Sequence, residues 1–231
     1  QDSTTEKVMG RIAKFAVSIL AIPFVISSSY ALYREIGKIY SLDSNQGYFI
    51  LGAVVYLIIH TVFFKPNVVY IFGHELTHAL AMFISAGKVK SFKVSKKGGE
   101  VKGTKSNIFI SLAPYFFPTY TLVIMLIWHV ARQIWNIRDY ISLFLFSVGL
   151  TLTFHFVMTV EFLKTKQPDL IKSGYMFSIV LIYLINLSIA ALILNFVFAD
   201  FSFKNYAYNA YDLGKEMYLW AWRQMFSLRG A

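Results

Sequence analysis

The sequence predicts an all-α integral membrane protein with about six transmembrane helices. Apolar residues make up 57% of its 231 positions, aromatic residues 18% and charged residues only 15%, which is too apolar for an ordinary soluble domain. The apolar residues stand in long continuous runs, and only helices or closed barrels satisfy every backbone polar group in lipid. Barrel strands would alternate apolar and polar residues, so the continuous runs favour helices.

Six runs are long enough to be membrane spans. A hydrocarbon core about 30 Å thick requires roughly 20 apolar residues, because a helix rises about 1.5 Å per residue. We expect residues 1–199 to form one six-helix transmembrane domain, with Pro114 and Pro118 bending the fourth helix. The expected spans are residues 15–32, 47–64, 67–86, 108–130, 140–163 and 175–199.

Two segments outside these runs are expected to have structure of their own. Residues 88–106 contain short β-prone pieces on either side of Gly98 and Gly99, which favours a β-hairpin with a glycine turn. A solvated basic loop is an equal alternative. The tail, residues 200–231, is rich in aromatic residues but interrupted by charges, so we expect an amphipathic helix at the membrane interface.

The charge of the chain fits a membrane surface. Its 22 Lys and Arg against 12 Asp and Glu give a net charge of +10, and the bases lie beside the apolar runs. Attraction to the lipid bilayer explains them without a nucleic-acid partner. If six helices alternate, 12 basic residues lie on the side of the hairpin and 10 lie with the chain ends. The positive-inside rule then places the hairpin in the cytoplasm by this small margin.

The third run contains a metal-binding pattern, HELTH, at residues 74–78. His74 and His78 are four residues apart, so a helix places both imidazoles on one face, where they can hold one metal ion. Glu75 lies beside that face and can act as a general base without being a ligand. The alternative is a polar cluster that joins helices. A carboxylate near the bilayer centre costs about 3 kcal/mol unless it is compensated, which favours the metal site.

A catalytic metal site of this type requires a third protein ligand. The chain has no cysteine, so the ligands must be nitrogen or oxygen atoms. Three candidates follow: His155 and Glu161 in the fifth run, and Asp169 after it. Depth in the membrane favours His155, which would otherwise be a buried histidine that bonds another helix or supports the ligands. Pro168 favours Asp169, because a proline ends the preceding helix and lets a short segment turn inward.

These motifs together resemble the intramembrane zinc metalloproteases of the site-2 protease family. The resemblance rests on HELTH within an apolar run, the glycine-turn hairpin, the proline-bearing helix and the Pro-Asp step at 168–169. It covers residues 67–185, which would form a protease-like core. It implies that Asp169 is the third zinc ligand, and Leu170 stands where the family usually has glycine.

The same resemblance implies an activity and partners. The expected reaction is hydrolysis of a peptide bond in or near a transmembrane segment of a membrane protein, with zinc as cofactor and Glu75 as general base. The hairpin would present the unwound substrate through Glu100 and Val101. Asn107 would bond the substrate backbone, unless it caps the next helix. Regulation of so short a chain would require a membrane partner.

Two other functions remain open. A multi-pass zinc protease of the prenyl-protein endopeptidase type would use Glu161, but the chain has Thr165 where those proteins carry the aspartate of an E-x-x-x-D motif. A non-catalytic membrane subunit or scaffold would keep the metal site as structure, and its aromatic tail would suit a protein partner.

Overall fold

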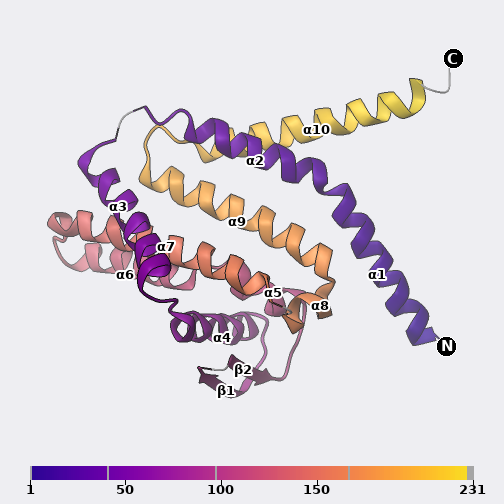
Figure 1. Cartoon of the computed structure of the whole chain (residues 1–231), viewed down its shortest axis with the longest axis horizontal. Helices are drawn as coiled ribbons and strands as arrows, with labels where there is room; N and C mark the ends of the chain where they lie inside the picture. Colours follow the sequence, from indigo (N-terminus) through magenta and orange to yellow (C-terminus); the bar gives the residue numbers. More distant parts are fainter. Residues whose placement is uncertain (1, 41, 97, 166, 228–231) are drawn as a thin grey trace. The chain divides into compact units, whose positions relative to one another are not determined.

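The computed structural model describes residues 2–40, 42–96, 98–165 and 167–227. The protein is built of α-helices and one two-stranded sheet (Figure 1). It divides into two compact units. Residues 1–41 and 174–231 make up the first unit, and residues 42–173 make up the second. All the residues of the candidate site belong to the second unit.

The first unit contains helices from both ends of the chain. Helix α2 packs against α9 and α10, and α1 packs against α9. Glu35 of α2 is buried, pairs with Lys38, and accepts a hydrogen bond from Asn209 of α10 at 3.4 Å. The tail is helical as expected, and α10 is not among the described helices that are apolar enough to cross a membrane. The bounds are α1 Asp2–Leu20, α2 Ile22–Ile36, α9 Tyr175–Val197 and α10 Phe203–Ser227.

The second unit contains the remaining helices and the hairpin. A capping box starts α3, in which the Gln46 backbone N–H donates to Asp43 Oδ1 at 2.7 Å. Asn107 caps α5, because its side chain accepts from the Ile110 backbone N–H at 2.7 Å. The bounds are α3 Ser44–Ile58 with a π-helical turn Ile59–Phe63, α4 Asn67–Ile84, β1 Val89–Ser95, β2 Gly98–Gly103, α5 Ile108–Phe116, α6 Thr119–Ile134, a 3₁₀ turn Arg138–Tyr140, α7 Ile141–Leu163 and α8 Pro168–Ser173.

Helices α3 and α7 run in the same direction. Near their beginnings Ser142 Oγ donates to Asn45 Oδ1 at 3.4 Å, and further along the Tyr56 and Phe154 rings are in contact at 5.4 Å. Helix α6 runs opposite to α7, since Thr121 bonds Thr151 and the Trp128 ring stacks on Phe144.

Two glycines bring the backbones of α3 and α7 together. A Cβ atom on Gly52 would lie 2.0 Å from the Phe146 carbonyl oxygen, and one on Gly149 would lie 2.0 Å from the Phe49 carbonyl oxygen. No side chain fits at either point, so glycine is required there. Small residues of this kind let transmembrane helices approach closely.

Four described segments are long and apolar enough to cross a membrane, or five if the bent pair α5 and α6 is one span. This pair bends by 74° at the break before α6, where Pro118 stands, whereas α5 continues through Pro114. Six spans are therefore not confirmed. The expected span that is missing from the observed set is α4, because His74, Glu75 and His78 lower its mean hydropathy. The four segments are Met9–Ile36, Asn45–Phe63, Arg138–Leu163 and Tyr175–Val197.

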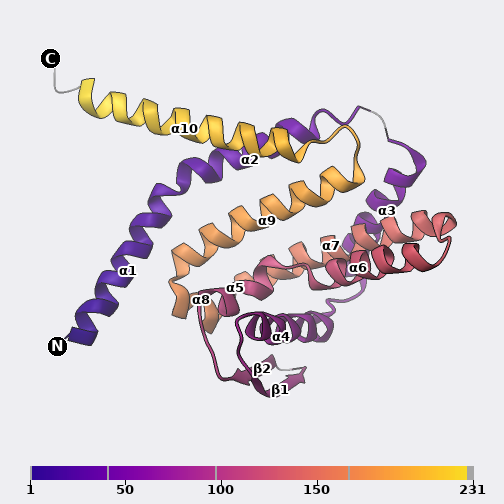
Figure 2. The same ribbon diagram turned by 180° about the vertical axis from the view of Figure 1, so that it is seen from behind.

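The expected hairpin, and not the alternative loop, is the observed structure. Strands β1 and β2 pair antiparallel, with Phe92 opposite Val101 and Lys93 opposite Glu100. Gly98 has a φ angle of +146°, which side chains rarely allow, so the turn requires glycine there. Both strands contact α4, and the hairpin lies beside that helix in Figure 1 and Figure 2.

Candidate metal centre

Helix α4 has its polar residues inside and its apolar residues outside. The His74 side chain is 9% exposed and Glu75 is buried, whereas Phe72, Leu80 and Phe83 are exposed. This is the reverse of a helix on the surface of a soluble protein, whose exposed face is polar. It is the arrangement expected where lipid surrounds the helix and a polar site lies within the protein.

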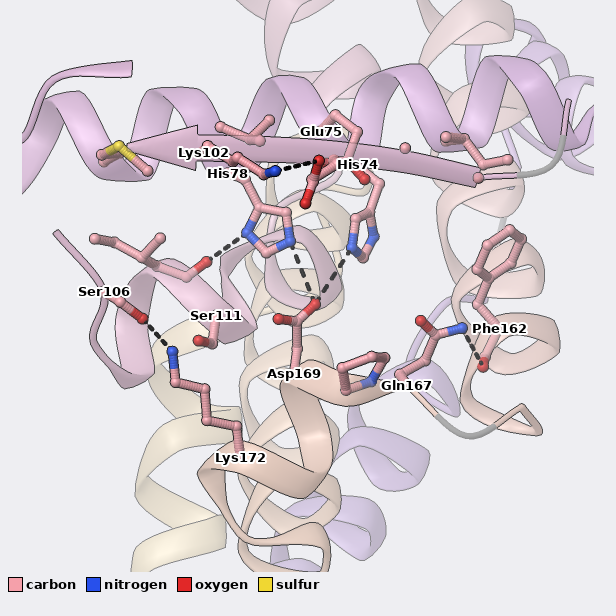
Figure 3. Close-up of a pocket in the computed structure, with 18 of the residues that line it drawn as sticks. His74, Glu75, His78, Lys102, Ser106, Ser111, Phe162, Gln167, Asp169 and Lys172 are labelled. Carbon is pink, nitrogen blue, oxygen red and sulfur yellow. Dashed lines mark hydrogen bonds and ion pairs between the residues drawn. The ribbon is translucent and has the colours of Figure 1, made fainter. Parts of the chain in front are cut away.

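Two histidines of α4 meet an aspartate of α8. The distance to Asp169 Oδ2 is 3.4 Å from His78 Nε2 and 4.0 Å from His74 Nε2. The candidate ligand atoms of the three residues all lie within 4.8 Å of one another. Figure 3 shows both imidazoles pointing from α4 toward the Asp169 carboxyl group. Among the described residues, this is the group of His, Asp and Glu side chains that could hold a metal ion.

A short helix brings Asp169 to this position. Helix α7 ends at Leu163, and Pro168 is the first residue of α8, so Asp169 lies in the first turn of α8. Leu170, at the position where glycine is usual in the resembled family, is 0% exposed. Because α8 also contacts α5, the buried leucine fixes the helix by packing.

The imidazole rings are held differently. His78 Nδ1 donates to the Ile110 carbonyl oxygen at 2.7 Å, which leaves Nε2 facing Asp169. A hydrogen bond at the second ring nitrogen is the usual way in which proteins orient a metal-binding histidine. His74 Nδ1 is buried and has no hydrogen-bond partner among the described residues. The His74 ring instead packs edge-on against Tyr115 at 5.0 Å.

The charge of Asp169 suits a ligand. Burial by itself raises the pKa of the Asp169 carboxyl, but the two imidazoles beside it outweigh burial and hold that pKa below its usual range. Asp169 is therefore a carboxylate at neutral pH. Two imidazole nitrogens and one carboxylate oxygen are a donor set that fits zinc and other divalent ions, with one coordination position left open.

Glu75 lies directly beneath strand β2. A Cβ atom on Gly99 would lie 2.4 Å from Glu75 Cγ and 2.6 Å from its Oε1. The β2 backbone therefore covers the carboxyl group, and only glycine leaves room for it. Figure 3 shows Glu75 on α4 beside His74 and His78, and it is not one of the three grouped donors.

The other two candidates for third ligand lie outside this group. Glu161 forms ion pairs with Lys65 at 2.8 Å and with Lys164 at 3.1 Å. His155 is buried on α7 and lines a small cavity of about 20 Å³ that His74 also lines. The geometry thus gives no support to a site that uses Glu161, and it leaves His155 beside the ligands.

A cleft of about 1280 Å³ opens beside the three donors. All residues of β2 line it, including Glu100, which pairs with Lys102 at 3.2 Å, and Val101, which also packs on the core between α4 and α5. Asn107 is not one of the lining residues, and its side chain caps α5. The structure therefore gives Asn107 the helix-cap role, not the substrate contact.

Three contributors to the site were missed by sequence reasoning. Ile110 acts through its backbone carbonyl and Tyr115 by packing, and neither leaves a signal in the residue pattern. Gly99 did leave a signal in the sequence. Only Gly98 has a backbone conformation special to glycine, so the turn does not explain the second glycine. A second glycine at such a turn indicates close approach by a neighbouring group.

Comparison with known proteins gives no relative. No protein-family model, curated protein or solved structure matches the chain. The function must therefore be argued from the motif and from the geometry of the site.

Proposed function

We propose that this chain is a membrane-embedded zinc endopeptidase that hydrolyses a peptide bond in or near a transmembrane segment of a membrane protein. The observation that carries the proposal is the convergence of His74, His78 and Asp169 from two helices, beside the buried Glu75. A polar cluster that only joined helices would not require a large cleft open to its donors.

Each residue of the site has its own role in the proposed reaction. When bound by the three donors, zinc would supply a Lewis acid that polarises the substrate carbonyl and acidifies water. Glu75 takes the proton of the attacking water on its carboxylate and returns it to the leaving amine. The Ile110 carbonyl orients His78, and the buried Leu170 holds α8, so two of the donors are fixed before substrate binds.

The cleft suits an extended peptide. Strand β2 pairs only with β1 among the described strands, and its residues line the cleft. A peptide can add to such an edge through backbone hydrogen bonds. A transmembrane helix must unwind before it can do so, which favours a substrate with a locally unwound segment, presented or regulated by a membrane partner.

Metal analysis combined with a cleavage assay tests the proposal. His78→Ala and Asp169→Asn should lose both zinc and hydrolysis of a fluorogenic transmembrane peptide. His129→Ala, which removes an exposed histidine of α6, should keep both. Full zinc content in both site variants contradicts the assigned site. Stoichiometric zinc without hydrolysis in the unchanged protein would favour the non-catalytic membrane subunit.

A further inference from the structure

The wall of the cleft is strongly basic. Outside the metal centre and Glu75, the described carboxylates that line it are Glu100 and Glu161. The lining lysines are more numerous: Lys65, Lys90, Lys96, Lys102, Lys105 and Lys172. The resulting excess of positive charge faces the space in which a substrate would lie, so it affects the choice of substrate.

The lysines differ in how they are neutralised. Lys65 has Glu161 at 2.8 Å, and Lys102 has Glu100 at 3.2 Å. Lys105 and Lys172 form no ion pair with a described carboxylate. Lys105 Nζ donates to the Ser85 carbonyl oxygen at 2.7 Å, and Lys172 Nζ donates to Ser106 Oγ at 2.6 Å. These two ammonium groups are therefore held in place by neutral acceptors.

Lys105 and Lys172 lie at one end of the cleft. Lys172 follows Asp169 by three residues on α8, so the two side chains lie on the same face of that helix. Figure 3 shows Lys172 and Ser106 together on the His78 side of Asp169, away from Phe162 and Gln167. Lys105 directly precedes Ser106 in the chain. We call Lys105 and Lys172 the lysine end of the cleft.

We propose that the lysine end is a subsite for an acidic side chain of the peptide substrate. This inference rests on the proposed function, and it adds a substrate class. A carboxylate adds Coulomb attraction to its hydrogen bond with an ammonium group, which a neutral oxygen does not supply. It would thus replace the serine acceptors of Lys105 and Lys172 favourably.

The strand geometry sets the distance of the acidic residue from the scissile bond. Gly99 lies over Glu75, and Lys102 stands three residues further along β2. At about 3.3 Å per residue these positions are about 10 Å apart. A peptide that runs along β2 toward Lys105 therefore brings residues at least three positions from the scissile bond to the lysine end.

A binding assay tests the subsite without turnover. The Glu75→Gln chain in a neutral detergent is titrated into a dye-labelled extended peptide that carries three consecutive Asp, and into the same peptide with Asn at those positions. Fluorescence anisotropy should show that the Asp peptide binds about tenfold more tightly, since each exposed ion pair contributes up to about 1 kcal/mol. High salt should remove the difference.

Charge variants locate the effect. Lys172→Glu should abolish the preference for Asp, and Lys172→Gln and Lys105→Gln should each reduce it severalfold. The matched control is Lys88→Glu, which makes the same charge change at an exposed lysine that does not line the cleft, and which should keep the preference. Thermal unfolding and zinc content show whether each variant remains folded.

Several outcomes overturn the subsite. Equal affinities for the Asp and Asn peptides would do so, as would an equal effect of Lys88→Glu, which would indicate only net charge. Loss of the preference in nanodiscs with phosphatidylglycerol, but not with phosphatidylcholine, would assign the lysine end to lipid phosphates. Hydrolysis without a preference contradicts this inference alone. A preference without any hydrolysis contradicts the proposed function alone.

Discussion

Glu75 is a buried carboxyl group on a helix whose outer face is apolar. Such burial is unfavourable unless neighbouring groups compensate for it. Its neighbours are the two histidines and the Gly99 backbone. Glu75 itself is not one of the three residues that could hold a metal ion. Within the proposed function, we assign this buried carboxyl group to proton transfer.

The variant Glu75→Gln separates this role from metal binding. We expect it to bind zinc like the unchanged protein but to hydrolyse peptides about 100- to 10,000-fold more slowly, the usual range for loss of a general base. Glu216→Gln, which removes an exposed carboxylate of α10, is the control and should remain active. Mass-spectrometric metal analysis and single-turnover cleavage check both. Undiminished cleavage by Glu75→Gln would remove the catalytic assignment.

Asn107 supports the metal centre through Ile110. Its side chain accepts from the Ile110 N–H, and the Ile110 carbonyl accepts from His78. We therefore expect Asn107→Ala to lower zinc affinity about tenfold or more, since partners of a ligand commonly contribute this much. Competition with a chromogenic chelator measures it. The control Asn205→Ala, on α10, should leave the zinc affinity unchanged. Unchanged zinc affinity in both variants would show that the position of the Ile110 carbonyl does not depend on the Asn107 cap.

At the scale of elements, strand β2 is both the cover of Glu75 and the wall of the cleft. It can serve in both ways because Gly99 lets its backbone rest on α4. Any side chain at residue 99 would displace either the strand or the carboxyl group.

We accordingly expect Gly99→Ala to reduce peptide cleavage about 10- to 100-fold, because a displacement of about 1 Å at a reacting group has effects of this size. Zinc content should stay normal, since the nearest atoms that the added Cβ would meet belong to Glu75 and not to one of the three donors. Gly47→Ala is the matched control, as a Cβ atom there has no neighbour within 4 Å. Equal losses in the two variants, or full activity in Gly99→Ala, would contradict a close approach of β2 to Glu75.

At the scale of the second unit, the parallel course of α3 and α7 limits the number of membrane crossings. Two parallel spans must be joined by an odd number of crossings, and the bent pair α5 and α6 supplies one. We therefore expect that helix α4 does not cross completely. The Lys65–Glu161 ion pair agrees, because strict alternation of six helices would separate these residues across the bilayer. We thus expect the hairpin, Lys65 and Lys172 on one side, and Arg132 and Arg138 on the other.

The absence of cysteine allows a direct topology test. Single-cysteine variants Lys65→Cys and Lys93→Cys should react with a membrane-impermeant maleimide from the same side of sealed vesicles. Arg138→Cys should react from the opposite side. Because lysines gather on the hairpin side, the positive-inside rule expects that side to be cytoplasmic. Labelling of residues 65 and 93 from opposite sides would instead restore a crossing by α4 and six spans.

Local features of the fold were predictable, and long-range ones were not. Two adjacent glycines favoured the hairpin, with a loop as the equal alternative, and Pro168 indicated where the helix before Asp169 ends, because each is a property of neighbouring residues. The parallel packing of α3 and α7 depends on Gly52 and Gly149, which lie about a hundred positions apart in the chain. The choice among Asp169, His155 and Glu161 likewise depends on how α8 packs, which no spacing in the sequence contains.

The bond between His78 and Ile110 has a consequence for proton balance. A carbonyl oxygen can only accept, so Nδ1 of His78 carries a proton, and in the neutral ring Nε2 presents a lone pair. That lone pair faces the negative Asp169 Oδ2 at 3.4 Å. Two acceptors at this distance require a positive species between them, either a proton on Nε2 or a metal ion. Metal uptake therefore displaces a proton, and the affinity of the centre for its ion should fall as the solution becomes more acidic.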